Sequence, residues 1–275
     1  MRTPSKWIVA VVVLLLAGVV GLVLRESRLK DAPPEPPVAA APPVTPPAAS
    51  PASAASEPAI HYPIEAASAP TAGPTDVEHV LAEIFGAKPV RSMFQLQDFP
   101  RRFVATVDNL GRAQAPSGLW PLNPVAGRFT VESRGDVQAL SADNAQRYTP
   151  YVLLLENVDM SVLAATYIRL YPLFQQAYEE LGYPGRYFND RLVQVIDQLL
   201  ATPIRETPLA MHLPTVAGTE KPQRPWVLYE FDDPALQSLS AGQRLLLRMG
   251  PVNERRVKAR LAEFRRLVAV EAARR

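Results

Sequence analysis

The chain has 275 residues, a formal net charge of +2 and no cysteine. The missing cysteine excludes disulfides, thiol nucleophiles and thiolate metal sites, and the small net charge argues neither for nor against a nucleic-acid partner. The three histidines, His61, His79 and His212, lie far apart, and no two have the i, i+4 spacing of a helical zinc site. We therefore expect no metal site and no cofactor.

An uncharged apolar segment near the N-terminus predicts a membrane anchor. Trp7 to Leu24 is a run of eighteen residues without a charge, at the short end of what crosses a bilayer. The alternative is a cleaved signal peptide, whose apolar region would be shorter and followed by a small-x-small cleavage site. A charged run, residues 25–28, follows here instead. We predict that residues 1–30 are a retained anchor whose partner is the lipid bilayer.

The charges beside this segment decide its orientation only weakly. Arg2 and Lys6 precede it, and Arg25, Arg28 and Lys30 follow it, so the positive-inside rule gives almost a tie. A short head before an apolar run resembles a signal-anchor, which favours an N-in, C-out arrangement. The reverse orientation would bring cytoplasmic partners, including nucleic acid, back into consideration.

Residues 31–74 are mostly proline and alanine, with four Pro-Pro pairs. Proline lacks a backbone N–H and fixes φ, which blocks helix and sheet and favours extended polyproline II conformations. This composition predicts a flexible linker. It is either a plain spacer or a docking site for a proline-reading domain.

Residues 75–275 are predicted to form one soluble, mainly helical domain. Thr75 and Glu78 have the spacing of a capping box at its start. Apolar periodicity predicts helices over residues 75–85, 101–110, 151–157, 159–181, 187–201, 240–250 and from 251 to the end, with a short one after Asp233. The good hairpin signal covers residues 128–132 and 137–140, and residues 226–231 are compatible with a strand. The predicted fold class is mainly α: one transmembrane helix, a disordered Pro/Ala arm, and a helical domain with a small β-hairpin.

The corner between the helices at 159–181 and 187–201 holds the candidate binding residues. They are Glu180, Tyr183, Arg186, Tyr187, Asn189, Asp190 and Arg191. One interpretation is structural: Asn189 or Asp190 caps the second helix, and the two arginines pair with nearby carboxylates. A second is a binding surface. In a third, Glu180 acts as a general acid beside the tyrosines, as in glycan cleavage, although no nucleophile elbow, phosphate loop or dinucleotide fingerprint is present.

Two further features stand out. Seven of the nine tyrosines lie between Tyr148 and Tyr187, and their helical spacing favours core packing over the rim of a sugar- or peptide-binding groove. Residues 251–275 carry eight basic and three acidic side chains. This C-terminal helix either docks on its own domain with a solvated basic face or presents a surface to anionic lipid or an acidic partner.

Three segments carry a family resemblance: RRFVATVDNL (101–110), YPLFQQAYEELGYPGRYFNDRLV (171–193) and LSAGQRLLLRMGP (239–251). With the anchor and the arm, they resemble an uncharacterised bacterial family, known only as a domain of unknown function, in single-pass membrane proteins of Gram-negative bacteria. The resemblance covers most of residues 75–268. It implies a bacterial inner-membrane protein with one domain, and it brings no activity, cofactor or catalytic residue.

The function that these observations favour is a membrane-tethered envelope protein with a non-enzymatic binding or scaffolding domain, which the C-out orientation would expose to the periplasm. Its partner is expected to be an envelope protein or a cell-wall component, and no nucleic acid is expected. The alternative is a membrane-tethered enzyme acting on an envelope polymer such as peptidoglycan. A deep polar cleft around Glu180 would favour the enzyme, and a shallow aromatic or charged surface would favour the binding module.

Overall fold

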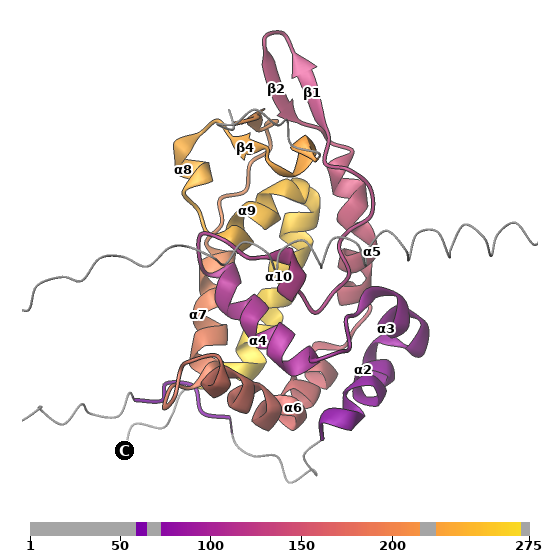
Figure 1. Cartoon of the computed structure of the whole chain (residues 1–275), viewed down its shortest axis with the longest axis vertical. Helices are drawn as coiled ribbons and strands as arrows, with labels where there is room; N and C mark the ends of the chain where they lie inside the picture. The colour runs from indigo at the N-terminus through magenta and orange to yellow at the C-terminus, as the bar shows by residue number, and fades with distance from the viewer. Residues whose placement is uncertain (1–58, 65–72, 215–223, 271–275) are drawn as a thin grey trace, which may run out of the picture. The chain divides into compact units, whose positions relative to one another are not determined.

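The computed structural model describes residues 59–64, 73–214 and 224–270 (Figure 1). All of them belong to the same structural unit, Ser56–Arg275. The predicted membrane anchor, Trp7 to Leu24, and most of the predicted linker lie outside the described residues, so the anchor stays a prediction.

Helices dominate the described part of the chain, which confirms the mainly helical class. Nine α-helices occur in these residues: α2 (Val77–Phe85), α3 (Ala87–Met93), α4 (Phe99–Leu110), α5 (Asn144–Glu156), α6 (Met160–Glu180), α7 (Phe188–Leu200), α8 (Pro234–Gln237), α9 (Ala241–Arg248) and α10 (Gly250–Val268). Thr75 and Glu78 form no capping box, because α2 begins at Val77 with Asp76 as its N-cap residue. Two other helices, predicted to begin at residues 159 and 240, do carry side-chain caps. The Asp159 carboxylate accepts from Ser161 N at 2.7 Å at the start of α6, and Ser240 forms a capping box with Gln243 at the start of α9.

The small hairpin of the prediction is part of a larger sheet, which corrects the predicted β content. Strands β1 (Val131–Arg134), β2 (Val137–Leu140), β3 (Ala210–His212) and β4 (Glu230–Phe231) form an antiparallel sheet in the order β1-β2-β3-β4. The β1–β2 turn uses Gly135 at φ 64°, and the hairpin projects from the domain (Figure 1). Strand β3 is only three residues long, which is too short to show an alternating pattern.

Two helices also differ from the prediction. Helix α3 was not predicted, and its Pro89 lies in the first turn, where a missing N–H costs little. Helix α5 starts seven residues before the predicted helix at Tyr151, because Pro150 is tolerated inside it. Of the predicted strand at 226–231, only Glu230–Phe231 is a strand.

The main core lies where α4, α6, α7 and α10 pack together. Phe188 is fully buried at its centre, with ring centroids 6.1 Å from Phe103, 6.3 Å from Phe174 and 5.4 Å from Tyr178. The predicted tyrosine stripe of α6 is buried in this core. Its members are Tyr167, Tyr171 and Tyr178.

A second, smaller core lies between the sheet and α8 and α9. It is built on Met211, Phe231, Leu236 and Leu247. The Arg248 guanidinium lies 5.6 Å from the Phe231 ring centroid and donates to Tyr229 O at 2.7 Å. The sheet is thereby attached to the helical part through α9.

Helix α10 docks on its own domain. This is the first of the two interpretations of the basic C-terminal helix, the other being a surface for anionic lipid or an acidic partner. Its apolar stripe of Val257, Leu261 and Phe264 packs on the main core, and Val268 is buried. Most of its basic side chains bind groups of the same domain: Arg255 contacts Glu206, Arg256 contacts Glu156, Lys258 donates to Thr202 O, Arg260 donates to Val158 O, and Arg265 contacts Asp197. Arg274 and Arg275 lie outside the described residues.

Among the described residues, no single helix is both long and apolar enough to cross a membrane. Helices α5 and α6 meet that criterion only when taken together, and they are bent by 84° at the break between them.

Replacing Phe188 by Ala should destabilise the domain by about 3–5 kcal/mol, because it removes a buried ring and leaves a cavity between α4, α6 and α7. Urea unfolding of the full chain in detergent measures the loss. The control is Leu153→Ala on α5, whose side chain is 45% exposed and whose loss should stay within about 0.5 kcal/mol. Equal losses for the two variants would contradict this core.

Glu254 of α10 should make stability depend on pH. Its carboxylate is buried, and Oε1 has no hydrogen-bond donor among the described residues. Burial raises its pKa, which Lys258 Nζ at 3.7 Å partly opposes. A carboxyl whose pKa is raised on folding contributes stability below its unfolded pKa and loses that contribution as pH rises through its folded pKa.

Glu254→Gln removes this titration. The unfolding free energy of the variant, minus that of the wild type, should therefore increase from pH 4 to pH 7. Denaturant midpoints of both proteins at several pH values measure this difference, and a difference that stays constant would contradict the expectation.

Candidate functional site

The predicted corner is a tight turn between α6 and α7. It contains two glycines in the left-handed region, Gly182 at φ 108° and Gly185 at φ 72°, a conformation that other residues adopt at a cost. Helix α7 follows with Tyr187 as its N-cap residue. Asn189 and Asp190 therefore lie inside the first turn of α7, and neither is the cap, which corrects the predicted capping role.

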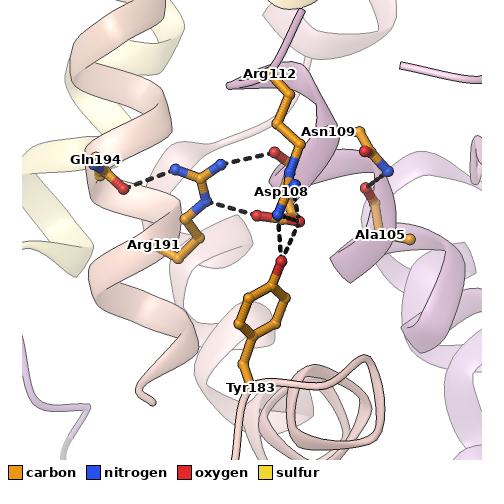
Figure 2. A network of polar contacts seen from close by, with 7 residues as sticks. All are labelled: Ala105, Asp108, Asn109, Arg112, Tyr183, Arg191 and Gln194. Atoms are coloured by element: carbon orange, nitrogen blue, oxygen red, sulfur yellow. Dashed lines mark hydrogen bonds and ion pairs between the residues drawn. The ribbon is translucent and has the colours of Figure 1, made fainter. Parts of the chain in front are cut away.

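A buried carboxylate from α4 anchors the corner (Figure 2). The Asp108 side chain is 6% exposed, and its Oδ1 accepts from Arg191 Nε at 2.8 Å. Its Oδ2 accepts from Arg112 Nε at 3.0 Å and from the Tyr183 hydroxyl at 3.2 Å. Arg191 also donates to the backbone oxygen of Asp108 at 2.8 Å and to Gln194 Oε1 at 2.7 Å. The predicted pairing of Arg191 with a carboxylate is confirmed, and the Asp108 charge raises the pKa of Arg112.

Asn189 is a fully buried polar residue of the corner. Its Oδ1 accepts from the Tyr167 hydroxyl at 3.0 Å. Its Nδ2 donates at 2.9 Å to both Tyr62 O and Val268 O, and its backbone N–H donates to the Tyr171 hydroxyl at 3.3 Å. One side chain thus joins α6, α7, the end of α10 and a segment from the N-terminal side of the domain.

That segment, residues 59–64, lies within the range that the sequence assigns to the linker; we call it the docked segment. The Asp190 carboxylate accepts from two successive backbone N–H groups, His61 at 3.0 Å and Tyr62 at 2.8 Å. The Tyr187 hydroxyl accepts from Ile64 N at 2.7 Å. Tyr62 and Ile64 also pack on the main core. The start of the domain at Thr75 stays a prediction, but His61, Tyr62 and Ile64 of this segment contact the domain.

An open groove of about 500 Å³ lies between the docked segment and α7. Both signs of charge line it, through Arg186, Arg191, Asp190 and Asp197, together with the rings of Tyr178 and Tyr187. The docked segment contributes Ala59, His61 and Tyr62. Arg186 is exposed and forms no ion pair within the described part of the chain, so its predicted pairing is wrong there.

The buried tyrosines beside the groove stay protonated at neutral pH. Burial raises the pKa of Tyr167 well above its usual value. Burial also raises the pKa of Tyr178, and the Asp108 charge adds to this effect. Both residues therefore contribute neutral rings, and the Tyr167 hydroxyl donates to Asn189 Oδ1.

Glu180 lies apart from the rest of the candidate set. It is exposed in the last turn of α6, and its Oε1 accepts from Gln176 Nε2 at 2.9 Å. It is not among the residues that line the groove. The other members contact Asp108, the docked segment or the groove, so the structure brings together six of the seven predicted residues.

Asp108 and the docked segment were not among the predicted site residues. Arg191 and Asp108 are separated by 83 positions, and Asn189 and Tyr62 by 127, so no local pattern marks their contacts. The available signal was the run His61-Tyr62-Pro63-Ile64, which interrupts the proline and alanine of the linker. No group of three or more possible metal ligands occurs in the ranges that the structure describes.

A family model matches residues 99–265 with the description "protein of unknown function (DUF3014)". The chain belongs to the DUF3014 family. The DUF3014 region contains Asp108, the corner and the groove side of α7, and the docked segment lies before it. No curated protein and no solved structure matches the chain, so the family assigns no specific function.

Removing the charge of Asp108 should be costly, because two guanidinium groups would lose their common partner in a largely buried place. We expect Asp108→Asn to lower the unfolding free energy by about 3–5 kcal/mol. Arg112→Gln should lower it by less than about 1 kcal/mol, because the Arg112 side chain is half exposed.

Chemical denaturation of the two full-length variants in detergent compares these losses. If Arg112→Gln cost as much as Asp108→Asn, the corner would depend on the exposed ion pair and not on the buried one to Arg191.

Proposed function

We propose that this DUF3014 protein is a membrane-tethered envelope protein whose domain binds a partner at the groove beside α7. The main support for this proposal is the groove, because its surface is open and offers several kinds of chemical group to a ligand. Arg186 offers an exposed guanidinium that has no ion pair among the described residues, Tyr187 a ring, and Gln194 an amide. Such a mixture of charges, rings and amides suits recognition of a peptide or a glycan.

The tether rests on the sequence. The apolar run Trp7 to Leu24 and the proline-rich residues 31–74 support a single-pass anchor followed by a linker, with the domain from residue 75. The resemblance to single-pass proteins of Gram-negative bacteria supports the inner membrane, and the signal-anchor pattern supports a periplasmic domain. The partner is then an envelope protein or a cell-wall component.

The geometry favours binding over the enzymatic alternative. A general acid has to reach its substrate within hydrogen-bonding distance. Glu180, the carboxylate on which that alternative depends, is exposed, bonds Gln176 and does not line the groove. The carboxylates that do line it already have partners, since Asp190 binds backbone N–H groups and Asp197 binds Arg265.

Site-specific photo-crosslinking in native membranes tests the proposal. A photoreactive amino acid at Gln194, which is exposed on the groove, should give a discrete adduct. The same amino acid at Leu153, which is 45% exposed on α5, serves as the control and should give none.

Orientation is tested in the same cells, because a reporter active only outside the cytoplasm should be active when fused after Arg275. Adducts from Leu153 alone, or from neither position, would contradict the groove as the binding surface. Loss of the cellular phenotype in Glu180→Gln with unchanged thermal stability would favour the enzyme.

A further inference from the structure

The docked segment is held mainly through its backbone. Asp190 accepts the N–H groups of His61 and Tyr62, Asn189 donates to the carbonyl of Tyr62, and Tyr187 accepts the N–H of Ile64. Backbone groups are common to all peptides, so these contacts do not by themselves require this sequence. We call Tyr187, Asn189 and Asp190 the α7 site.

The spacing of these contacts defines the peptide that fits. Of the four residues 61–64, three donate their backbone N–H groups to the α7 site. The fourth is Pro63, which has no N–H to donate. Tyr62 and Ile64, on either side of it, pack on the main core. The matching ligand is a short non-helical peptide with an aromatic residue, a proline and an aliphatic residue in succession.

From this geometry we infer that the α7 site is a peptide-binding site, filled in cis by residues 59–64, from which a peptide of the same chemistry can displace them. The inference rests on the proposed function and names its ligand class: a segment of a partner protein of the form x-aromatic-Pro-aliphatic. Asn189 gives this site a fixed hydrogen-bond donor, because its side chain is fully buried and its Nδ2 donates to the carbonyl of Tyr62 in the bound segment.

The occupant also forms one wall of the groove. Ala59, His61 and Tyr62 line it together with Arg186 and Gln194, so a competing peptide would meet the groove as well as the α7 site. The cis segment has an advantage, because covalent connection gives it an effective concentration in the millimolar range. A free peptide should therefore bind weakly to the wild-type chain and well to a chain whose own segment has been weakened.

A labelled peptide of residues 58–65 is the probe, and fluorescence anisotropy with the full chain in detergent is the measurement. In the triple variant Ile60→Gly, Tyr62→Gly, Ile64→Gly, we expect saturable binding at least tenfold tighter than to the wild type. Adding Asp190→Ala to that variant should weaken binding at least tenfold. The matched control is Glu180→Gln in the same background, an exposed carboxylate of the same corner that should leave the affinity unchanged.

Hydrogen exchange on the wild-type chain gives a second measurement that does not depend on the variants. Excess unlabelled peptide should speed exchange of the Tyr62 and Ile64 amides, and a scrambled peptide should not. Each of three results would overturn the inference. They are a folded triple variant that does not bind the peptide, an affinity that is unchanged by Asp190→Ala, and amide exchange that is unchanged at millimolar peptide. If photo-crosslinking at Gln194 gave an adduct but the peptide did not bind, this inference would fail and the proposed function would stand. If the peptide bound but crosslinking gave no adduct, the result would count only against the proposed function.

Discussion

A buried amide has to find a partner for each of its polar atoms, because an unsatisfied donor or acceptor in the core costs about 1–3 kcal/mol. Asn189 meets this requirement with groups from three other parts of the chain: its amide bonds the Tyr167 hydroxyl of α6, the last carbonyl of α10 and the carbonyl of Tyr62. Its backbone N–H also donates to the Tyr171 hydroxyl of α6. None of these groups can move far without leaving a polar atom unpaired. The arrangement of α6, α7, α10 and the docked segment therefore depends on this side chain.

Three successive residues in the first turn of α7 bind three different neighbours of this helix. Consecutive positions on an α-helix point about 100° apart, so Asn189, Asp190 and Arg191 face different neighbours. Asn189 faces the core, Asp190 the docked segment, and Arg191 the Asp108 carboxylate of α4. The first turn of α7 thus fixes the core, the N-terminal segment and the α4 side of the domain at once, and the groove lies among these contacts.

Periodicity and caps predicted the elements that have a clear local pattern. These include α4, α6, α7, α9, α10 and the β1–β2 hairpin. Helix α3, strand β3 and the first half of α5 were missed, because Pro89 and Pro150 argue against helix locally and three residues are too few to show alternation. For the site, the turn residues at 182–191 indicated the place, but the distant partners of Asn189, Asp190 and Arg191 include residues 61, 62, 108 and 268. Contacts over such distances depend on tertiary packing and leave no periodic trace.

The attachment of the docked segment to α7 also determines where mechanical force would enter the domain. A pull on the chain from its N-terminal side would first load the bonds that His61, Tyr62 and Ile64 make to Asp190, Asn189 and Tyr187, and only after these broke would it reach α2 at Val77. Several hydrogen bonds to one helix would have to break before the core felt the load. The docked segment would thus shield α2 from a force applied to the chain on its N-terminal side.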